Sequence, residues 1–326
     1  MKSIEHYWYH QNLVSWLLLP LAGLYCLLIS LRIKLYQLGW LKSYRAPIPV
    51  IVVGNLTVGG TGKTPLIIWL TRWLKSQGLR PGIISRGYGS KAGYYPYEIK
   101  SFSTAEETGD EPLLLQNRTG VPVVIGPDRQ ADIEKLLAEH DCNIILSDDG
   151  LQHYRLQRDI EIAIVDGTRG FGNGFCLPSG PLREPVTRLN RVDMIMVNGG
   201  GDNQLAFKVI PGEVYSVGGS CEQLQLDAFA GQKVHAVAGI GNPQRFFDLL
   251  QQHQVEIIPH VFRDHHQYHE YELDFADELP VLMTEKDAVK CRRMQLKNLW
   301  YLDIDIQLSD IAKQRLQHLL EQVQDG

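Results

Sequence analysis

The 326-residue sequence lacks the features that mark several classes of protein. None of its cysteines forms a CxxC pair, and their odd number favours a reducing compartment over a disulfide-stabilised secreted fold. The five are Cys26, Cys142, Cys176, Cys221 and Cys291. A formal net charge of -5 argues against nucleic-acid binding, so we expect no nucleic-acid partner. The chain has no internal repeat and no low-complexity tract, and its 44% hydrophobic content is enough for one large or two modest ordered domains.

A glycine-rich loop is the clearest functional signal. It follows the apolar run from Pro49 to Val53 and precedes a helical pattern from Pro65 to Leu74. Backbone N–H groups of such a loop can surround phosphate oxygens, Lys63 can reach the β and γ phosphates, and Thr64 can offer its hydroxyl to Mg²⁺. The predicted nucleotide site comprises Thr57, Val58, Gly59, Gly60, Thr61, Gly62, Lys63 and Thr64. The alternative is a glycine-rich turn that contains a lysine by chance.

Two adjacent carboxylates end a second apolar strand. Asp148 and Asp149 follow the run from Asn143 to Ser147, which is where phosphate-loop enzymes hold Mg²⁺ through a strand-end aspartate. Neighbouring side chains on an extended segment point to opposite sides, so the two acids need not share one task. One can serve the metal while the other orients water or a neighbouring base. Asp-Asp-Gly is also ordinary turn chemistry, and that interpretation stays open here.

The N-terminus carries an uncharged stretch from Leu13 to Leu31. As a helix its 19 residues extend about 28 Å, close to the thickness of a bilayer core. The stretch could span the membrane, lie in its interface or be buried against the rest of the protein, and Pro20 is expected to kink it. A cleaved signal peptide is the least favoured interpretation, because no small-x-small site follows and export would separate the loop from ATP. The basic residues that follow predict a cytoplasmic C-terminal side; they are Arg32, Lys34, Lys42 and Arg45.

Alternating apolar runs and helical patterns predict an α/β fold. We expect a P-loop NTPase-like, doubly wound parallel sheet over residues 46–198, after an N-terminal membrane-associated helical segment over residues 1–45. Helical patterns within the core cover Glu106 to Gln116 and Arg129 to His140. Residues 199–326 are expected to form a second, smaller α/β lobe. Its Gly239-Ile-Gly241 turn has two interpretations, a nucleotide-binding turn or close packing of a strand on a helix.

Seven further segments follow one another in order along the chain: Gly54–Pro65, Ile84–Gly89, Thr108–Pro112, Ser147–His153, Pro178–Glu184, Phe262–Tyr268 and Thr284–Lys290. Together they resemble the tetraacyldisaccharide 4'-kinase family of lipid A biosynthesis. The resemblance extends from the N-terminal helix to near the C-terminus. It implies transfer of the ATP γ-phosphate to the 4'-hydroxyl of a tetraacyldisaccharide 1-phosphate, giving lipid IVA, at the cytoplasmic face of the bacterial inner membrane. The expected cofactors are ATP and Mg²⁺, and the expected partners are an anionic acylated disaccharide and the membrane surface; no obligate protein partner is inferred.

The resemblance also implies residue roles. Asp110 matches the family's catalytic base and His265 the histidine that pairs with it, although the residues alone leave His266 as an alternative. Thr64, Asp148 and Asp149 would share the Mg²⁺ and active-site water duties, and Lys63 and Asp149 join Asp110 and His265 as expected catalytic residues. Asp110 could instead cap the helix that follows it.

Substrate binding is expected to involve a basic segment. Six arginines lie between Arg155 and Arg191, and a basic face there could hold a sugar phosphate or lipid headgroups, with Arg183 the strongest candidate. Two other classes of function stay open, a membrane-associated P-loop regulatory NTPase and an ATP-driven assembly factor.

Overall fold

Short runs of branched apolar residues form the strands of a mixed, mainly parallel sheet. The computed structural model describes residues 5–10, 12–201, 204–218, 222–294 and 296–324. Their strands are β1 (Val50–Gly54), β2 (Pro81–Ser85), β3 (Tyr97–Glu98), β4 (Val123–Ile125), β5 (Ile144–Asp148), β6 (Ile160–Asp166), β7 (Met194–Asn198), β8 (Ala206–Ser216), β9 (Gln223–Gln225), β10 (Lys233–Ala238), β11 (Glu256–Val261), β12 (Val281–Thr284) and β13 (Leu299–Leu308).

The helices connect these strands and cover the sheet. They are α1 (Glu5–Trp8), α2 (Leu13–Gln37), α3 (Lys63–Ser76), α4 (Ala105–Thr108), α5 (Asp110–Thr119), α6 (Arg129–Glu139), α7 (Pro243–Gln252), α8 (Glu270–Leu273), α9 (Glu285–Cys291) and α10 (Asp310–Gln324), with 3₁₀ turns at Val186–Arg191 and Leu226–Phe229. The sheet order is β11-β10-β12-β13-β8-β7-β6-β1-β5-β2-β4-β3, and β9 pairs with β8 off this path.

The first lobe buries both faces of its sheet. Ile51 and Val53 of β1 face a core shared with α3, α5 and α10, whereas Val50 and Val52 face a second core that includes residues of α6. Strands with both faces covered carry continuous apolar runs, which is why these strands could be recognised in the sequence. The predicted doubly wound α/β fold is confirmed, with antiparallel pairing where β8 meets β13 and where β3 meets β4.

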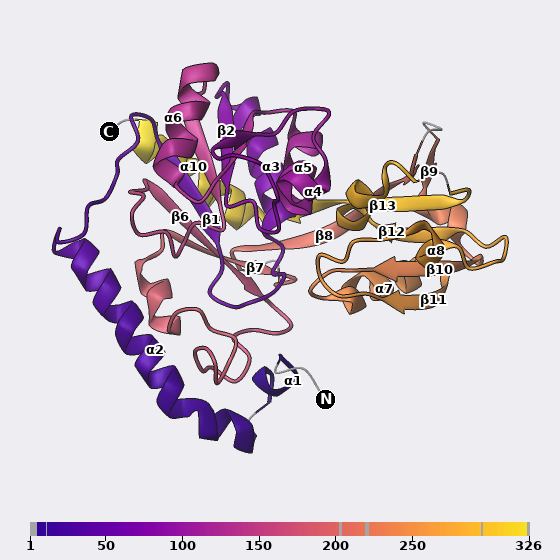
Figure 1. The fold of residues 1–326 in the computed structure, drawn as a ribbon, viewed down its shortest axis with the longest axis horizontal. Helices are drawn as coiled ribbons and strands as arrows, with labels where there is room; N and C mark the ends of the chain where they lie inside the picture. Colours follow the sequence, from indigo (N-terminus) through magenta and orange to yellow (C-terminus); the bar gives the residue numbers. More distant parts are fainter. Residues whose placement is uncertain (1–4, 11, 202–203, 219–221, 295, 325–326) are drawn as a thin grey trace.

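A long antiparallel ribbon joins the two lobes. In Figure 1, β8 and β13 run from the first lobe to the second, where β10, β11 and β12 continue the sheet. After β13, helix α10 packs back on the first lobe through Ala312, Leu316 and Leu319. The last helix therefore shares the core of the predicted 46–198 unit, and the division of the chain at residue 198 stays a prediction.

Two sequence expectations need correction. The predicted helix from Glu106 to Gln116 is two helices, α4 and α5, separated at Gly109, whose φ of 84° ends one helix and begins the next. The buried-helix interpretation of residues 13–31 is wrong, because only 11% of the most apolar window of α2 is buried. Helix α2 continues through Pro20 and reaches Gln37, farther than the apolar stretch predicts. Cys221 lies outside the described residues.

Candidate active site

The glycine-rich loop lies between β1 and α3, at the carboxyl edge of the sheet. Gly59 and Gly62 have φ angles of 102° and 96°, a left-handed region in which glycine avoids the strain of a side chain. Gly62 also lies so close to Asn198 that a Cβ atom would come within 2.4 Å of its Nδ2. The loop therefore has the conformation and helix N-terminus that suit a phosphate group.

Lys63 begins α3 and is held by two oxygen atoms. Its Nζ donates a 3.1 Å hydrogen bond to Asn55 Oδ1 and lies 3.5 Å from Asp149 Oδ1. Asn55 is fully buried and also donates to the carbonyl of Thr57, so it braces the loop from inside. Sequence reasoning missed Asn55, although it lies directly between the strand and the glycine-rich loop.

The two strand-end carboxylates have different partners. Asp148 is paired with Val53 across β1 and β5, and its Oδ2 accepts a 2.9 Å hydrogen bond from Ser85. Burial, together with nearby Glu111 and Asp149, raises the pKa of Asp148 to about 6. Its Oδ1 is buried with no hydrogen-bond partner among the described residues. Excess negative charge and an orphaned carboxylate oxygen fit a divalent cation with oxygen ligands.

Asp149 turns away from Asp148 because its backbone is left-handed, with a φ of 50°. Its Oδ2 accepts a 2.8 Å hydrogen bond from Arg183 while Oδ1 faces Lys63. Burial opposes ionisation, but Lys63 and Arg183 outweigh it and hold the pKa of Asp149 below its usual value. Asp149 thus links Arg183 to Lys63 at the end of the glycine-rich loop.

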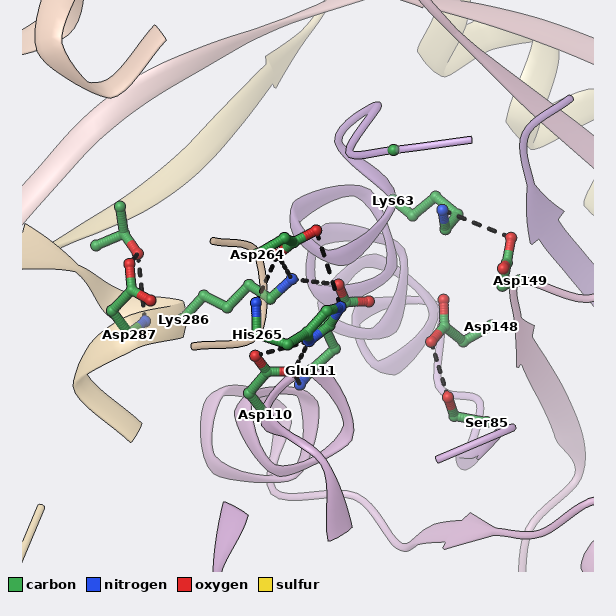
Figure 2. Close-up of polar contacts among 12 residues, drawn as sticks. Lys63, Ser85, Asp110, Glu111, Asp148, Asp149, Asp264, His265, Lys286 and Asp287 are labelled. Carbon is green, nitrogen blue, oxygen red and sulfur yellow. Dashed lines mark hydrogen bonds and ion pairs between the residues drawn. The ribbon is translucent and has the colours of Figure 1, made fainter. Parts of the chain in front are cut away.

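An aspartate–histidine pair bridges the two lobes. Asp110 is the first residue of α5, and both of its carboxylate oxygens accept from His265 Nδ1, at 2.9 and 3.0 Å (Figure 2). The hydrogen bond to Asp110 raises the pKa of His265, against burial and the charge of Lys286, which lower it. His266 instead pairs with Glu272, at 3.1 Å, so the geometry selects His265 as the partner of Asp110. The N-cap residue of α5 is Gly109, which has no side chain to cap the helix, and Asp110 is the first residue inside the helix rather than its cap.

The glycine-rich loop is contacted from both lobes. From the end of β7 in the first lobe, Asn198 donates to the Thr61 carbonyl at 3.0 Å. From the second lobe, Gly241 lies so close that a Cβ atom on it would come within 2.8 Å of Gly60 N, so the second lobe packs directly on the glycine-rich loop. Figure 2 shows Lys63, Asp148 and Asp149 on one side of the view and the aspartate–histidine pair beside them.

Comparison with known proteins decides the family. The sequence model described as tetraacyldisaccharide-1-P 4'-kinase matches residues 14–324. The chain belongs to this family. It is 48% identical over 322 residues to the tetraacyldisaccharide 4'-kinase of Nitrosococcus oceani, covering 98% of this chain and 94% of that one. It is also 48% identical over 321 residues to the enzyme of the same name from Pseudomonas aeruginosa, with 96% of each chain covered.

A solved structure agrees with the family assignment. The crystal structure of "apo" form LpxK from Aquifex aeolicus, in complex with ATP, superposes with a TM-score of 0.78 at 28% identity, covering 95% of this chain and 99% of that one. The predicted family, fold and kinase class are thereby confirmed. The regulatory NTPase and assembly-factor alternatives are set aside, because the family and its relatives are named as kinases.

Most arginines of the 155–191 segment stabilise the kinase fold rather than form one basic face. Arg158 and Arg188 both form ion pairs with the buried carboxylate of Glu161, at 2.5 and 2.6 Å. Arg155 pairs with Asp128 at the surface. Of the six, Arg183 contacts a predicted site residue, Asp149, and Arg169 donates to the Gly241 carbonyl at 2.8 Å. The arginines of residues 155–191 therefore do not form one continuous basic face.

One side of helix α2 packs against the first lobe. Tyr25 donates to the Arg183 carbonyl at 3.0 Å, and the Ser15 carbonyl accepts from the Ser179 hydroxyl at 2.6 Å. Its other side exposes large apolar residues: Leu13, Trp16, Leu17, Leu21, Leu24, Leu27, Leu28 and Leu31. Within the described part of the chain, α2 is the one helix long and apolar enough to cross a membrane.

Proposed function

We propose that the protein transfers the γ-phosphate of ATP to the 4'-hydroxyl of a tetraacyldisaccharide 1-phosphate, the step that gives lipid IVA in lipid A biosynthesis. The match to the tetraacyldisaccharide-1-P 4'-kinase family over residues 14–324 carries this proposal. The glycine-rich loop and the Asp110–His265 pair supply the two parts that such a reaction needs, a phosphate-binding loop and a proton acceptor.

Residues 57–64 would hold the ATP phosphates, and Lys63 would exchange Asn55 and Asp149 for phosphate oxygens. Thr64 and Asp148 would hold Mg²⁺, supported by the orphaned Asp148 Oδ1 and the excess negative charge around it. A bound Mg²⁺ neutralises phosphate charge. Asp149 would keep Arg183 aligned toward the transferred phosphoryl group through their ion pair.

The geometry of the pair supports His265, rather than Asp110, as the residue that receives the proton of the substrate hydroxyl. Asp110 is 4% exposed and both of its oxygens face His265, whereas the His265 side chain is 27% exposed. With Nδ1–H donated to Asp110, neutral His265 keeps its lone pair on Nε2. Asp110 would then orient the imidazole and stabilise the imidazolium, as in other carboxylate–histidine pairs. This reverses the roles that the family resemblance implied.

The same proposal places the enzyme at the cytoplasmic face of the bacterial inner membrane. Helix α2 would lie in the membrane interface, because Ser15 and Tyr25 fix one side of it to the catalytic lobe while leucines cover the other. To stand across a bilayer, the helix would have to break these contacts with the first lobe. The acylated disaccharide would then reach the site from the membrane surface.

The test is a transfer assay with γ-labelled ATP, Mg²⁺ and a tetraacyldisaccharide 1-phosphate in vesicles, resolved by thin-layer chromatography. We expect a labelled lipid from the wild-type enzyme and almost none from Lys63→Ala. Free labelled phosphate without labelled lipid would overturn the proposal and favour a nucleotide-driven switch.

A further inference from the structure

A set of charged groups surrounds His265 beyond its contact with Asp110. Lys286 and Lys290 reach toward the pair from α9, Asp264 lies beside it on the same loop, and the Tyr88 ring packs at 5.0 Å between centroids. Lys290 is 3.8 Å from Asp110 but is engaged more closely by Asp287, at 2.8 Å. Lys286 is therefore the cation in this set that lies within 3.0 Å of a carboxylate of each lobe.

Lys286 joins residues that are far apart in the sequence. Its Nζ lies 2.7 Å from Glu111 Oε1, on α5 of the first lobe, and 3.0 Å from Asp264 Oδ1, on the loop of the second lobe (Figure 2). Its side chain is 15% exposed, so water screens these ion pairs only in part. The two carboxylates that flank the aspartate–histidine pair in the sequence, Glu111 and Asp264, thus meet on one ammonium group.

Asp264 is the group that could disable the imidazole. Its Oδ2 is 3.8 Å from His265 Nε2, while its Oδ1 accepts from the His265 backbone N–H at 3.1 Å and binds Lys286. A small rotation would bring Oδ2 within hydrogen-bond distance of Nε2. An imidazolium held between Asp110 and Asp264 could not accept a proton from a substrate hydroxyl.

We propose that Lys286 is a positioning residue, which holds Asp264 away from His265 Nε2 and, through its positive charge, keeps the imidazole neutral and able to accept the substrate proton. This inference rests on the proposed role of His265. Without Lys286, less positive charge would offset the negative charge of Asp110, Glu111 and Asp264 near the imidazole ring. The protonated form of His265 would therefore gain stability.

The expected effect has a definite sign. A nearby positive charge disfavours imidazolium, so the pKa of His265 should rise when Lys286 is replaced by Met. The neutral fraction at pH 7 then falls, and the acidic limb of the kcat/KM profile moves to higher pH by the same amount. Replacing Asp264 by Asn removes a negative charge and should move the limb to lower pH.

The experiment compares Lys286→Met, Lys286→Arg and Asp264→Asn with wild type by two measurements. The first is the pH profile of kcat/KM in the labelled-lipid assay. The second is direct NMR titration of His265 in the nucleotide-free enzyme, assigned by its loss in His265→Ala. We expect the arginine variant to keep the wild-type midpoint, the methionine variant to lose activity at pH 7 and recover at alkaline pH, and the two measurements to shift together.

A uniform loss at every pH in Lys286→Met, with an unchanged His265 midpoint, would show a merely structural lysine and overturn the inference. If Lys286→Met does not fold, as judged by thermal unfolding, Asp264→Asn decides, and an unshifted midpoint there overturns it as well. Failure of the proposed role of His265 is distinguishable, because it appears as wild-type turnover in His265→Ala, and failure of the proposed function appears as free phosphate without labelled lipid from the wild-type enzyme. The NMR titration does not depend on turnover.

Discussion

A methyl group at position 241 tests whether the second lobe closes on the nucleotide loop in the working enzyme. Gly241 follows β10, and its added Cβ would meet Gly60 N at 2.8 Å, whereas its other neighbour, Asp264 Oδ2, is at an ordinary 3.5 Å. No unusual φ is needed at Gly241, so contact, and not backbone strain, requires glycine there. Either the loop or the lobe must move by a few tenths of an ångström or more in Gly241→Ala.

Forcing extra atoms into a packed contact costs about 1–3 kcal/mol. The strain can be relieved by moving the second lobe, because the buried cluster around β10 and α7 is separate from the cluster of the first lobe, which Val289 of α9 joins. Moving the lobe carries His265 away from Asp110. If the whole strain favours the separated arrangement, the ratio of assembled to separated enzyme falls by a factor of about 5–140, since 1.4 kcal/mol is tenfold.

We therefore expect Gly241→Ala to lower kcat, by up to the same factor, while the midpoint of thermal unfolding changes little. The assay is steady-state lipid phosphorylation at several ATP concentrations, with calorimetry on the same preparation. Gly93→Ala is the matched control, because a Cβ there has no neighbour within 4 Å. Wild-type kcat and KM for ATP in Gly241→Ala would refute the reasoning, since the lobe would then not rest on the loop during turnover.

Three further predictions concern the loop, the aspartate–histidine pair and the N-terminal helix. Lys63→Ala and Thr64→Ala should each lower kcat about 10²-fold or more, because each removes a preorganised contact to the transferred phosphate; near-normal turnover in both would exclude the loop as the nucleotide site. Asp110→Asn and His265→Ala should each reduce kcat, and the double variant should lose less than the product of the two, whereas multiplicative losses would mean that the residues act independently. A chain that starts at Ser43 should keep a folded core but bind anionic vesicles less well and phosphorylate a lipid acceptor more slowly, because the exposed leucines and the Tyr25 and Ser15 contacts are lost. Cosedimentation with vesicles measures the binding. Full membrane binding by the truncated chain would place the attachment elsewhere in the protein.

The fold of the first lobe could be predicted because its signals are local. The glycine-rich loop, the apolar runs of β1, β5 and β6 and the repeat of buried residues in α3 each lie within a short window. The ribbon of β8 and β13 was not predicted, although Leu299–Leu308 alternates apolar and polar residues for much of its length, the pattern of a half-buried strand. Strand β11 was also missed, since Pro259 lowers the expectation of a strand even at the edge of a sheet, where proline is tolerated.

The sequence alone determined which residue types were available for phosphate binding and where they lie along the chain. The loop chemistry at residues 57–64, the strand-end acids and the family segments depend on residues a few positions apart, so they can be read without a structure. Only the tertiary structure decided which of two adjacent histidines meets Asp110, because 155 positions separate the partners and the choice depends on the backbone turn at His265, with its φ of 61°. The same holds for Lys286, whose link between Glu111 and Asp264 exists only because α9 lies across the junction of the two lobes.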